Sequence, residues 1–80
     1  MNVNEACKIA LNNMPGCHII SASETDDGWL FSFENSDGTL QDELPMLISK
    51  EDGRIIEYSY EDYFVEILEA EPVELSELKL

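Results

Sequence analysis

One short stretch, W-L-F-S-F-E at residues 29–34, constrains the fold of this chain more than any other. Successive side chains of a β-strand point to opposite faces, so Trp29, Phe31 and Phe33 share one face of a strand. Turn sequences that end in glycine stand on both sides of the stretch. The pattern predicts a strand whose aromatic face lies in the core of a small sheet. For Trp29, a place on a contact surface is the alternative, because Trp is enriched among residues that dominate binding energies.

Two predicted hairpins surround this strand. In the first, residues 18–23 pair with it through the turn Asp26-Asp27-Gly28, where Gly28 is expected to supply the positive φ of a tight turn. In the second, strands over about residues 46–49 and 54–59 flank a K-E-D-G loop, whose Asp-Gly pair is typical of hairpins. The expected sheet is therefore antiparallel and has three to four strands.

The first predicted helix covers residues 3–14, where apolar residues recur at i, i+3, i+4 and i+7 spacing. Asn2 and Glu5 stand in the positions of a capping box, and Pro15-Gly16 ends the helix. Cys7 lies on the apolar side of this helix, so we expect it to be a core residue without special reactivity.

The second predicted helix covers residues 60–70 and is amphipathic, with Ser59 at its start. Pro72 cannot continue it, so residues 71–80 form either a tail or an edge strand. Together the elements predict a single α+β domain over residues 1–80, in which an N-terminal and a C-terminal helix flank a small antiparallel sheet. The apolar side of the second helix consists of Tyr60, Tyr63, Phe64, Ile67 and Leu68.

The charge balance is the second unusual feature. Asp and Glu number 18 against four Lys and Arg, which gives a formal net charge of −14. Between Ile55 and Leu78 there are eight carboxylates and no Lys or Arg. Such a surface repels phosphate backbones and anionic lipids and attracts basic proteins, which disfavours nucleic acid and membranes as partners. Two explanations stay open for the acidic surface: solubility of a small protein, and recognition of a basic protein partner.

Residues suited to catalysis or metal binding are scarce. His18 is the only histidine, and its neighbour Cys17 should point to the opposite face of a strand, so we expect no nucleophile–base pair. Neither a zinc-binding cysteine spacing nor a calcium-binding loop is present, and each glycine is explained by a turn. Asp26 and Asp27 are assigned to a turn rather than to acid–base chemistry. The sequence predicts no catalytic residue, no metal and no cofactor.

The sequence also bears on the compartment. Two cysteines are too few for the disulfide framework of a secreted chain of this length, which favours a reducing compartment. The N-terminal residues lack the basic and apolar regions of a signal peptide. We expect a cytoplasmic protein, and the sequence leaves open whether it is a monomer or a dimer.

Three motifs follow one another along the chain. They are D-G-W-L-F-S-F at residues 27–33, P-M-L-I-S-K-E-D-G-R-I at residues 45–55 and S-Y-E-D-Y-F at residues 59–64. In this order they resemble a bacterial family known as immunity protein 35, or the YrhB-like domain. The layout of that family covers about 70 of the 80 residues.

The resemblance implies an immunity protein of a polymorphic or contact-dependent toxin system, which binds and neutralises a toxin in a toxin-antitoxin manner. Four residues match the family motif and look like positions that set the fold: Trp29, Pro45, Lys50 and Gly53.

The charge adds the expectation that carboxylates meet a basic patch on the toxin. A nuclease fits best, because enzymes that hold nucleic acid carry basic clefts. The alternative function is that of a small acidic stress or housekeeping protein that acts as a non-catalytic interaction module. The residues expected to contact the partner are Glu57, Glu61, Asp62, Glu66 and Glu69.

Overall fold

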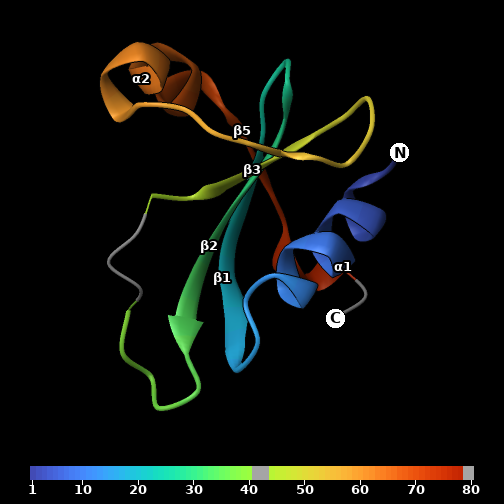
Figure 1. Cartoon of the computed structure of the whole chain (residues 1–80), viewed down its shortest axis with the longest axis vertical. Coiled ribbons are helices and arrows are strands. Elements are labelled where there is room, and N and C mark those ends of the chain that lie inside the picture. Colours follow the sequence, from blue (N-terminus) through green and yellow to red (C-terminus); the bar gives the residue numbers. More distant parts are fainter. Residues whose placement is uncertain (41–43, 79–80) are drawn as a thin grey trace.

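The structure is a computed structural model that describes residues 1–40 and 44–78 (Figure 1). Over these residues it is an α+β fold, as the sequence predicts. In chain order the elements are α1 (Val3–Asn12), β1 (Cys17–Glu24), β2 (Gly28–Asn35), β3 (Met46–Ser49), β4 (Ile55–Ile56), α2 (Tyr60–Glu69), β5 (Glu71–Val73) and the 3-10 helix η1 (Leu75–Glu77).

The described strands form one antiparallel sheet in the order β4-β3-β2-β1-β5. The prediction of three to four strands is wrong, because the chain adds β5 to the free edge of β1, where Val73 pairs with Ala22. The tail predicted for residues 71–80 is therefore wrong at residues 71–73, and the edge strand is the correct alternative. Residues 79 and 80 lie outside the described part. The fourth strand is shorter than the predicted range 54–59, because only β4 itself pairs with β3.

The main core cluster lies between α1 and one face of the sheet, while Leu30 and Leu47, which pair with one another, are buried on the opposite face. The face predicted to be buried is confirmed: Phe31 is fully buried, and Trp29 and Phe33 are 6% exposed. From α1, three small buried side chains meet this face: Ala6, Cys7 and Ala10. Their size lets the helix approach the aromatic strand closely. The capping box is confirmed as well, since the Asn2 side chain accepts a hydrogen bond from the Glu5 backbone and the Glu5 side chain accepts one from the Asn2 backbone.

Gly28 is needed for a different reason from the expected one. The glycines with positive φ are Gly16, Gly38 and Gly53, and Gly28 is not among them. Instead, a Cβ atom on Gly28 would lie 1.9 Å from the carbonyl oxygen of Ile48. Gly28 pairs with Ser49 in the sheet, so the missing side chain lets β2 and β3 approach at the start of their ladder. The turn that Gly28 closes also depends on Thr25, whose backbone N–H donates to the Gly28 carbonyl at 2.8 Å.

The second helix does not flank the sheet in the predicted way. It follows β4 at one edge of the sheet and is followed by β5 at the other edge, so it connects strands that are four positions apart. Four strand spacings amount to about 19 Å, whereas ten helical residues span about 15 Å. A ten-residue helix is therefore long enough to bridge most of that distance, and its Tyr63 hydroxyl contacts Thr25 and Asp27 at the β1–β2 turn. In Figure 1, α1 lies against the sheet while α2 stands apart from it at the upper end.

No residue of α2 is buried, whereas three residues of α1 are. Of the five residues on the predicted apolar side of this helix, Tyr63 and Ile67 are half-buried, and Tyr60, Phe64 and Leu68 are exposed. A helix that flanked the sheet as predicted would cover this whole side, and these three residues are not covered. Within residues 1–40 and 44–78, no helix has the length and apolarity needed to cross a bilayer.

Candidate protein-binding surface

A hydroxyl network holds α2 to the turn between β1 and β2. The Tyr63 hydroxyl lies 2.8 Å from the Thr25 hydroxyl and donates to the Asp27 carboxylate at 3.0 Å. Thr25 is 7% exposed, and its side-chain oxygen also accepts the backbone N–H groups of Asp27 and Gly28. Thr25 was not among the residues predicted from the sequence to have a special role. Its position directly before the D-D-G turn was the available signal, because threonine hydroxyls often hydrogen-bond the backbone of such turns.

A second tyrosine fixes the chain where it enters α2. The Tyr58 hydroxyl donates to the Pro45 carbonyl at 2.5 Å, and the Tyr58 and Tyr63 rings lie 5.1 Å apart. Burial raises the pKa of both tyrosines above the ordinary value. For Tyr63 the hydrogen bond to Asp27 raises the pKa further, while the Thr25 hydroxyl acts in the opposite direction. Ser59 caps the helix by accepting the Asp62 backbone N–H at 3.2 Å.

These contacts leave two other sides of α2 facing solvent. The first is the acidic side of α2, formed by Asp62, Glu66 and Glu69, which share a face at i, i+4 and i+7 spacing. The second is apolar, and we call it the α2 ridge. Its members are exposed by 47%, 41%, 58% and 68%, in the order Tyr60, Phe64, Val65 and Leu68.

The five residues predicted to contact a partner are all exposed. Glu57 precedes the helix, Glu61 stands beside the α2 ridge at i, i+4 spacing from Val65, and the other three form the acidic side of α2. In the described part of the chain, the ion pairs are His18–Glu34, Lys50–Glu24 and Arg54–Asp52, so none involves these five carboxylates. All five therefore lie on α2 or shortly before it, and α2 also carries the exposed α2 ridge. Three of the ridge residues, Tyr60, Phe64 and Leu68, belong to the apolar side predicted for this helix, whereas Val65 does not.

A hollow of about 340 Å³ continues this region at the C-terminal end of α2. Lys50 lines it and pairs with Glu24, with 2.6 Å between the ammonium nitrogen and a carboxylate oxygen. The helix C-terminus adds a partial negative charge at the same place. Besides Lys50, the lining of the hollow includes five acidic residues: Glu24, Asp26, Glu66, Glu69 and Glu71.

The four motif positions lie at the second hairpin and in the core. Trp29 is buried, and the Lys50 ammonium lies 5.7 Å from the centre of its ring. Pro45 directly precedes β3 and is half-buried. Gly53 has a φ of +74°, and an added Cβ atom would lie 2.5 Å from the end of Met1 and 2.7 Å from the end of Ile9. Gly53 therefore permits both a left-handed turn and contact between the hairpin and α1.

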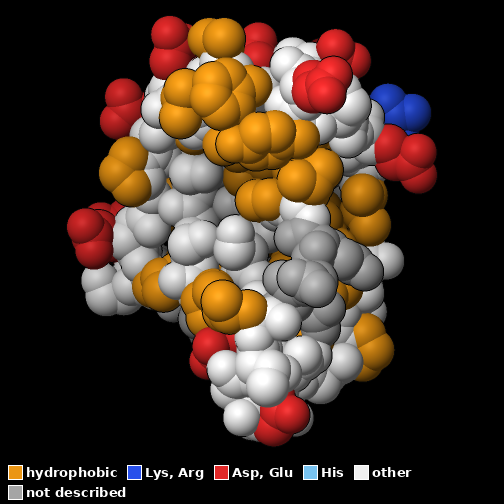
Figure 2. Space-filling model, turned by 90° about the vertical axis from the view of Figure 1, so that its left-hand side faces the viewer, with side chains coloured by type: hydrophobic (Ala, Val, Ile, Leu, Met, Phe, Trp, Pro, Cys, Tyr) orange, Lys and Arg blue, Asp and Glu red, His pale blue; other side chains and the backbone are white. Residues whose placement is uncertain are grey.

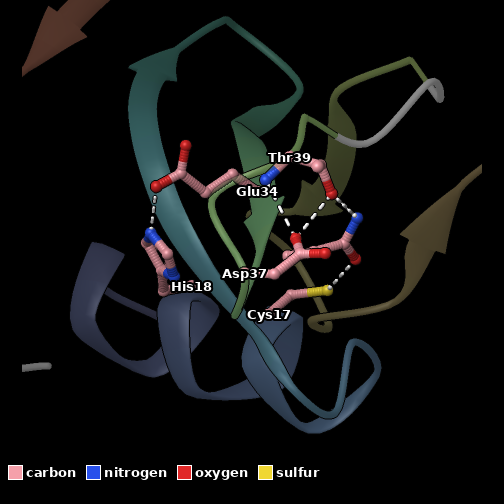
Figure 3. Close-up of polar contacts among 6 residues, drawn as sticks. Cys17, His18, Glu34, Asp37 and Thr39 are labelled. Carbon is pink, nitrogen blue, oxygen red and sulfur yellow. Dashed lines mark hydrogen bonds and ion pairs between the residues drawn. The ribbon is translucent and has the colours of Figure 1, made fainter.

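Cys17 and His18 point away from one another, as strand alternation predicts (Figure 3). His18 pairs with Glu34 across the β1–β2 ladder, whereas the Cys17 sulfur lies 3.6 Å from the Asn35 side-chain oxygen. Burial raises the pKa of the Cys7 thiol, which disfavours its reactive thiolate form. Among the described residues, no three His, Cys, Asp or Glu side chains come together in a way that could hold a metal ion.

The chain was compared with protein-family models, with curated proteins and with solved structures. None of them matched it.

Proposed function

We propose that this protein is a non-catalytic binding protein of the immunity type, which neutralises a bacterial toxin by pressing an acidic surface against a basic one. The single observation that carries the proposal is the exposure of all five carboxylates at Glu57, Glu61, Asp62, Glu66 and Glu69, in a stretch without a lysine or arginine. The resemblance of the three motifs to the immunity protein 35 family supplies the class of partner.

The electrostatics favour fast recognition of a cationic protein. A formal net charge of −14 raises the rate of encounter with a basic surface, and carboxylates without an ion pair can meet that surface directly. A nuclease toxin presents such a surface in its nucleic-acid cleft. An acidic protein that covers the cleft competes with the nucleic acid and needs no chemistry of its own.

Co-expression tests this proposal. The product of the adjacent gene is produced in cells with and without this protein, and growth is measured. If the proposal is correct, the adjacent gene's product inhibits growth when it is produced alone and does not inhibit growth when this protein is produced with it. A neighbour that is harmless throughout, or equally toxic in both cases, contradicts the proposal.

A charge-matched pair of variants then tests the surface. One variant changes the five carboxylates to amides: Glu57→Gln, Glu61→Gln, Asp62→Asn, Glu66→Gln and Glu69→Gln. The control makes the same change in net charge elsewhere: Glu5→Gln, Glu34→Gln, Glu51→Gln, Glu74→Gln and Glu77→Gln. We expect the first variant to lose protection and the second to retain most of it, because local complementarity outweighs net charge at short range. Equal protection by both would show that the contact surface lies elsewhere.

A further inference from the structure

The α2 ridge is an apolar surface that the fold itself leaves uncovered. Leu68 is 68% exposed and Val65 is 58% exposed, whereas Tyr63 and Ile67 of the same helix are half-buried. The rings of Tyr60 and Phe64 pack edge to face with centres 5.5 Å apart, so the aromatic part of the ridge is already ordered. Single exposed apolar residues are ordinary, but a contiguous apolar strip with a polar rim marks an interaction site.

The surroundings of the ridge define what can cover it. Glu61 and the acidic side of α2 border it, and the acidic hollow lies beyond its C-terminal end. Figure 2 shows hydrophobic side chains gathered on the upper part of the molecule, at the level of α2, with Asp and Glu side chains around them. A second copy of this chain would bring the same negative charge to the same place, and the two copies would repel one another. A cationic partner meets no such repulsion.

We infer that the α2 ridge is the anchoring site for a basic amphipathic helix of the partner protein. Apolar side chains of that helix would cover the ridge, and its flanking Lys or Arg side chains would reach the acidic side of α2 and the hollow. This is the helix-on-helix form of recognition, in which apolar anchors at i, i+3 or i+4 and i+7 supply the affinity and charges supply rate and selectivity. The inference rests on the proposed function and names the chemistry of its partner.

The two sets of residues have different roles in this arrangement. Exposed carboxylates are well solvated, and a rim charge changes mainly the association rate. The aromatic and aliphatic side chains of the ridge lose contact with water when covered, so they should dominate the dissociation rate. Tyr60 and Phe64 are suited to this because an ordered aromatic pair loses little conformational freedom on binding.

A synthetic peptide of Leu and Lys serves as the probe. It has about 15 residues, with Leu at helical i, i+3, i+4 and i+7 spacing and Lys elsewhere. Two control peptides replace every Leu by Ser or every Lys by Glu. We expect the Leu/Lys peptide to bind, the Ser/Lys peptide to bind at least about tenfold more weakly, and the Leu/Glu peptide not to bind. Binding is measured by calorimetry, and NMR chemical-shift changes locate it on the protein.

Matched variants locate the anchor on the ridge. Leu68→Ser and Phe64→Ser should each weaken binding of the Leu/Lys peptide about tenfold. Leu40→Ser is the control, because Leu40 is 69% exposed but pairs with Glu34 at the far end of β2 from α2. Equal effects of Leu68→Ser and Leu40→Ser, or shift changes confined to residues outside α2, would overturn the inference.

The remaining outcomes separate the inference from the proposed function. Equal binding of the Leu/Lys and Ser/Lys peptides would mean that charge alone makes the contact. The inference about the α2 ridge would then be wrong, while the proposed function as an acidic binding protein would stand. The inference about the α2 ridge is also wrong if the Phe64→Ser and Leu68→Ser variants protect co-expressing cells as well as the parent protein does. Sedimentation at high salt tests whether a second copy of this chain occupies the ridge instead. A dimer of the parent protein that becomes a monomer in the Leu68→Ser variant would show that it does. The proposed function fails, by contrast, if the neighbouring gene product is harmless alone or if the parent protein gives no protection against it.

Discussion

The two helices of this protein have the same length and similar amphipathic sequences, yet only α1 has fully buried residues. Helix α1 has ten residues and buries three of them, whereas α2 has ten residues and buries none. The difference lies in where the chain must go next. Helix α1 leads into β1 by a short turn and folds back on the sheet, while α2 has to link opposite sheet edges. An apolar side on a helix therefore indicates that something covers it, and the path of the chain decides whether that is the protein's own core.

The largest expected difference between the two regions is in the cost of removing a phenylalanine. Phe31→Ala should lower the free energy of unfolding by about 3–5 kcal/mol, because Phe31 is fully buried under α1. Phe64→Ala, on the α2 ridge, should change it by no more than about 0.5 kcal/mol. Urea denaturation followed by circular dichroism measures both.

If Phe31→Ala does not fold, Phe31→Leu gives a milder variant, with an expected loss of about 1–2 kcal/mol. A loss for Phe64→Ala as large as that for Phe31→Leu would mean that α2 is packed as tightly as α1, and the comparison between the helices would fail.

The attachment of α2 should depend on one hydroxyl. Tyr63→Phe removes the partner of Thr25 and Asp27, and we expect a loss of about 1–2 kcal/mol with faster amide exchange in α2 than in α1. Tyr60→Phe removes a hydroxyl from the exposed ridge of the same helix and should have almost no effect on either quantity. Uniform exchange across both helices in Tyr63→Phe would show that α2 is not held separately from the core.

Alkaline pH should loosen the same attachment. The pKa of Tyr63 is raised in the folded protein, so the native state retains this proton more tightly than the unfolded chain does. The resulting stability is present below the ordinary tyrosine pKa of about 10 and is lost as pH rises above it. Urea denaturation between about pH 8.5 and 11 should show a smaller decline for Tyr63→Phe than for the parent. If the free energy of unfolding declines equally in both proteins, the titration of Tyr63 is not the cause of the decline.

The smallest effect is expected at Lys50, beside the hollow next to α2. Lys50→Ala removes an ion pair with Glu24 that is partly exposed on both sides, so the loss should be no more than about 1 kcal/mol. Lys8→Ala removes the same charge from an exposed position of α1 and corrects for the change in net charge. A difference between these variants well above about 1 kcal/mol would mean that Lys50 sets the fold more strongly than a surface pair can.

Local patterns in the sequence were sufficient for much of the fold. Alternation placed Trp29, Phe31 and Phe33 on a buried face, and the capping signals at Asn2 and Ser59 marked the start of both helices. These features depend on residues a few positions apart, so the sequence holds all the information they need. The exposure of the five carboxylates belongs to the same class, because ionised groups stay in water wherever the helix lies.

Other features depend on residues that only the folded chain brings together. Gly28 matters because the backbone of Ile48 approaches it, and Thr25 matters because Tyr63 reaches it from 38 positions away. The pairing of β5 with β1 is of this kind too, since a three-residue strand carries little signal of its own.

The sequence by itself thus determined which segments form helices and strands, where the core-facing aromatic strand lies, and where negative charge accumulates. Only the tertiary structure decided that the apolar side of α1 would be buried and that much of the apolar side of α2 would stay exposed. The physical reason is that periodicity records the preference of a side chain for contact, whereas the order of strands in the sheet fixes which surfaces can meet.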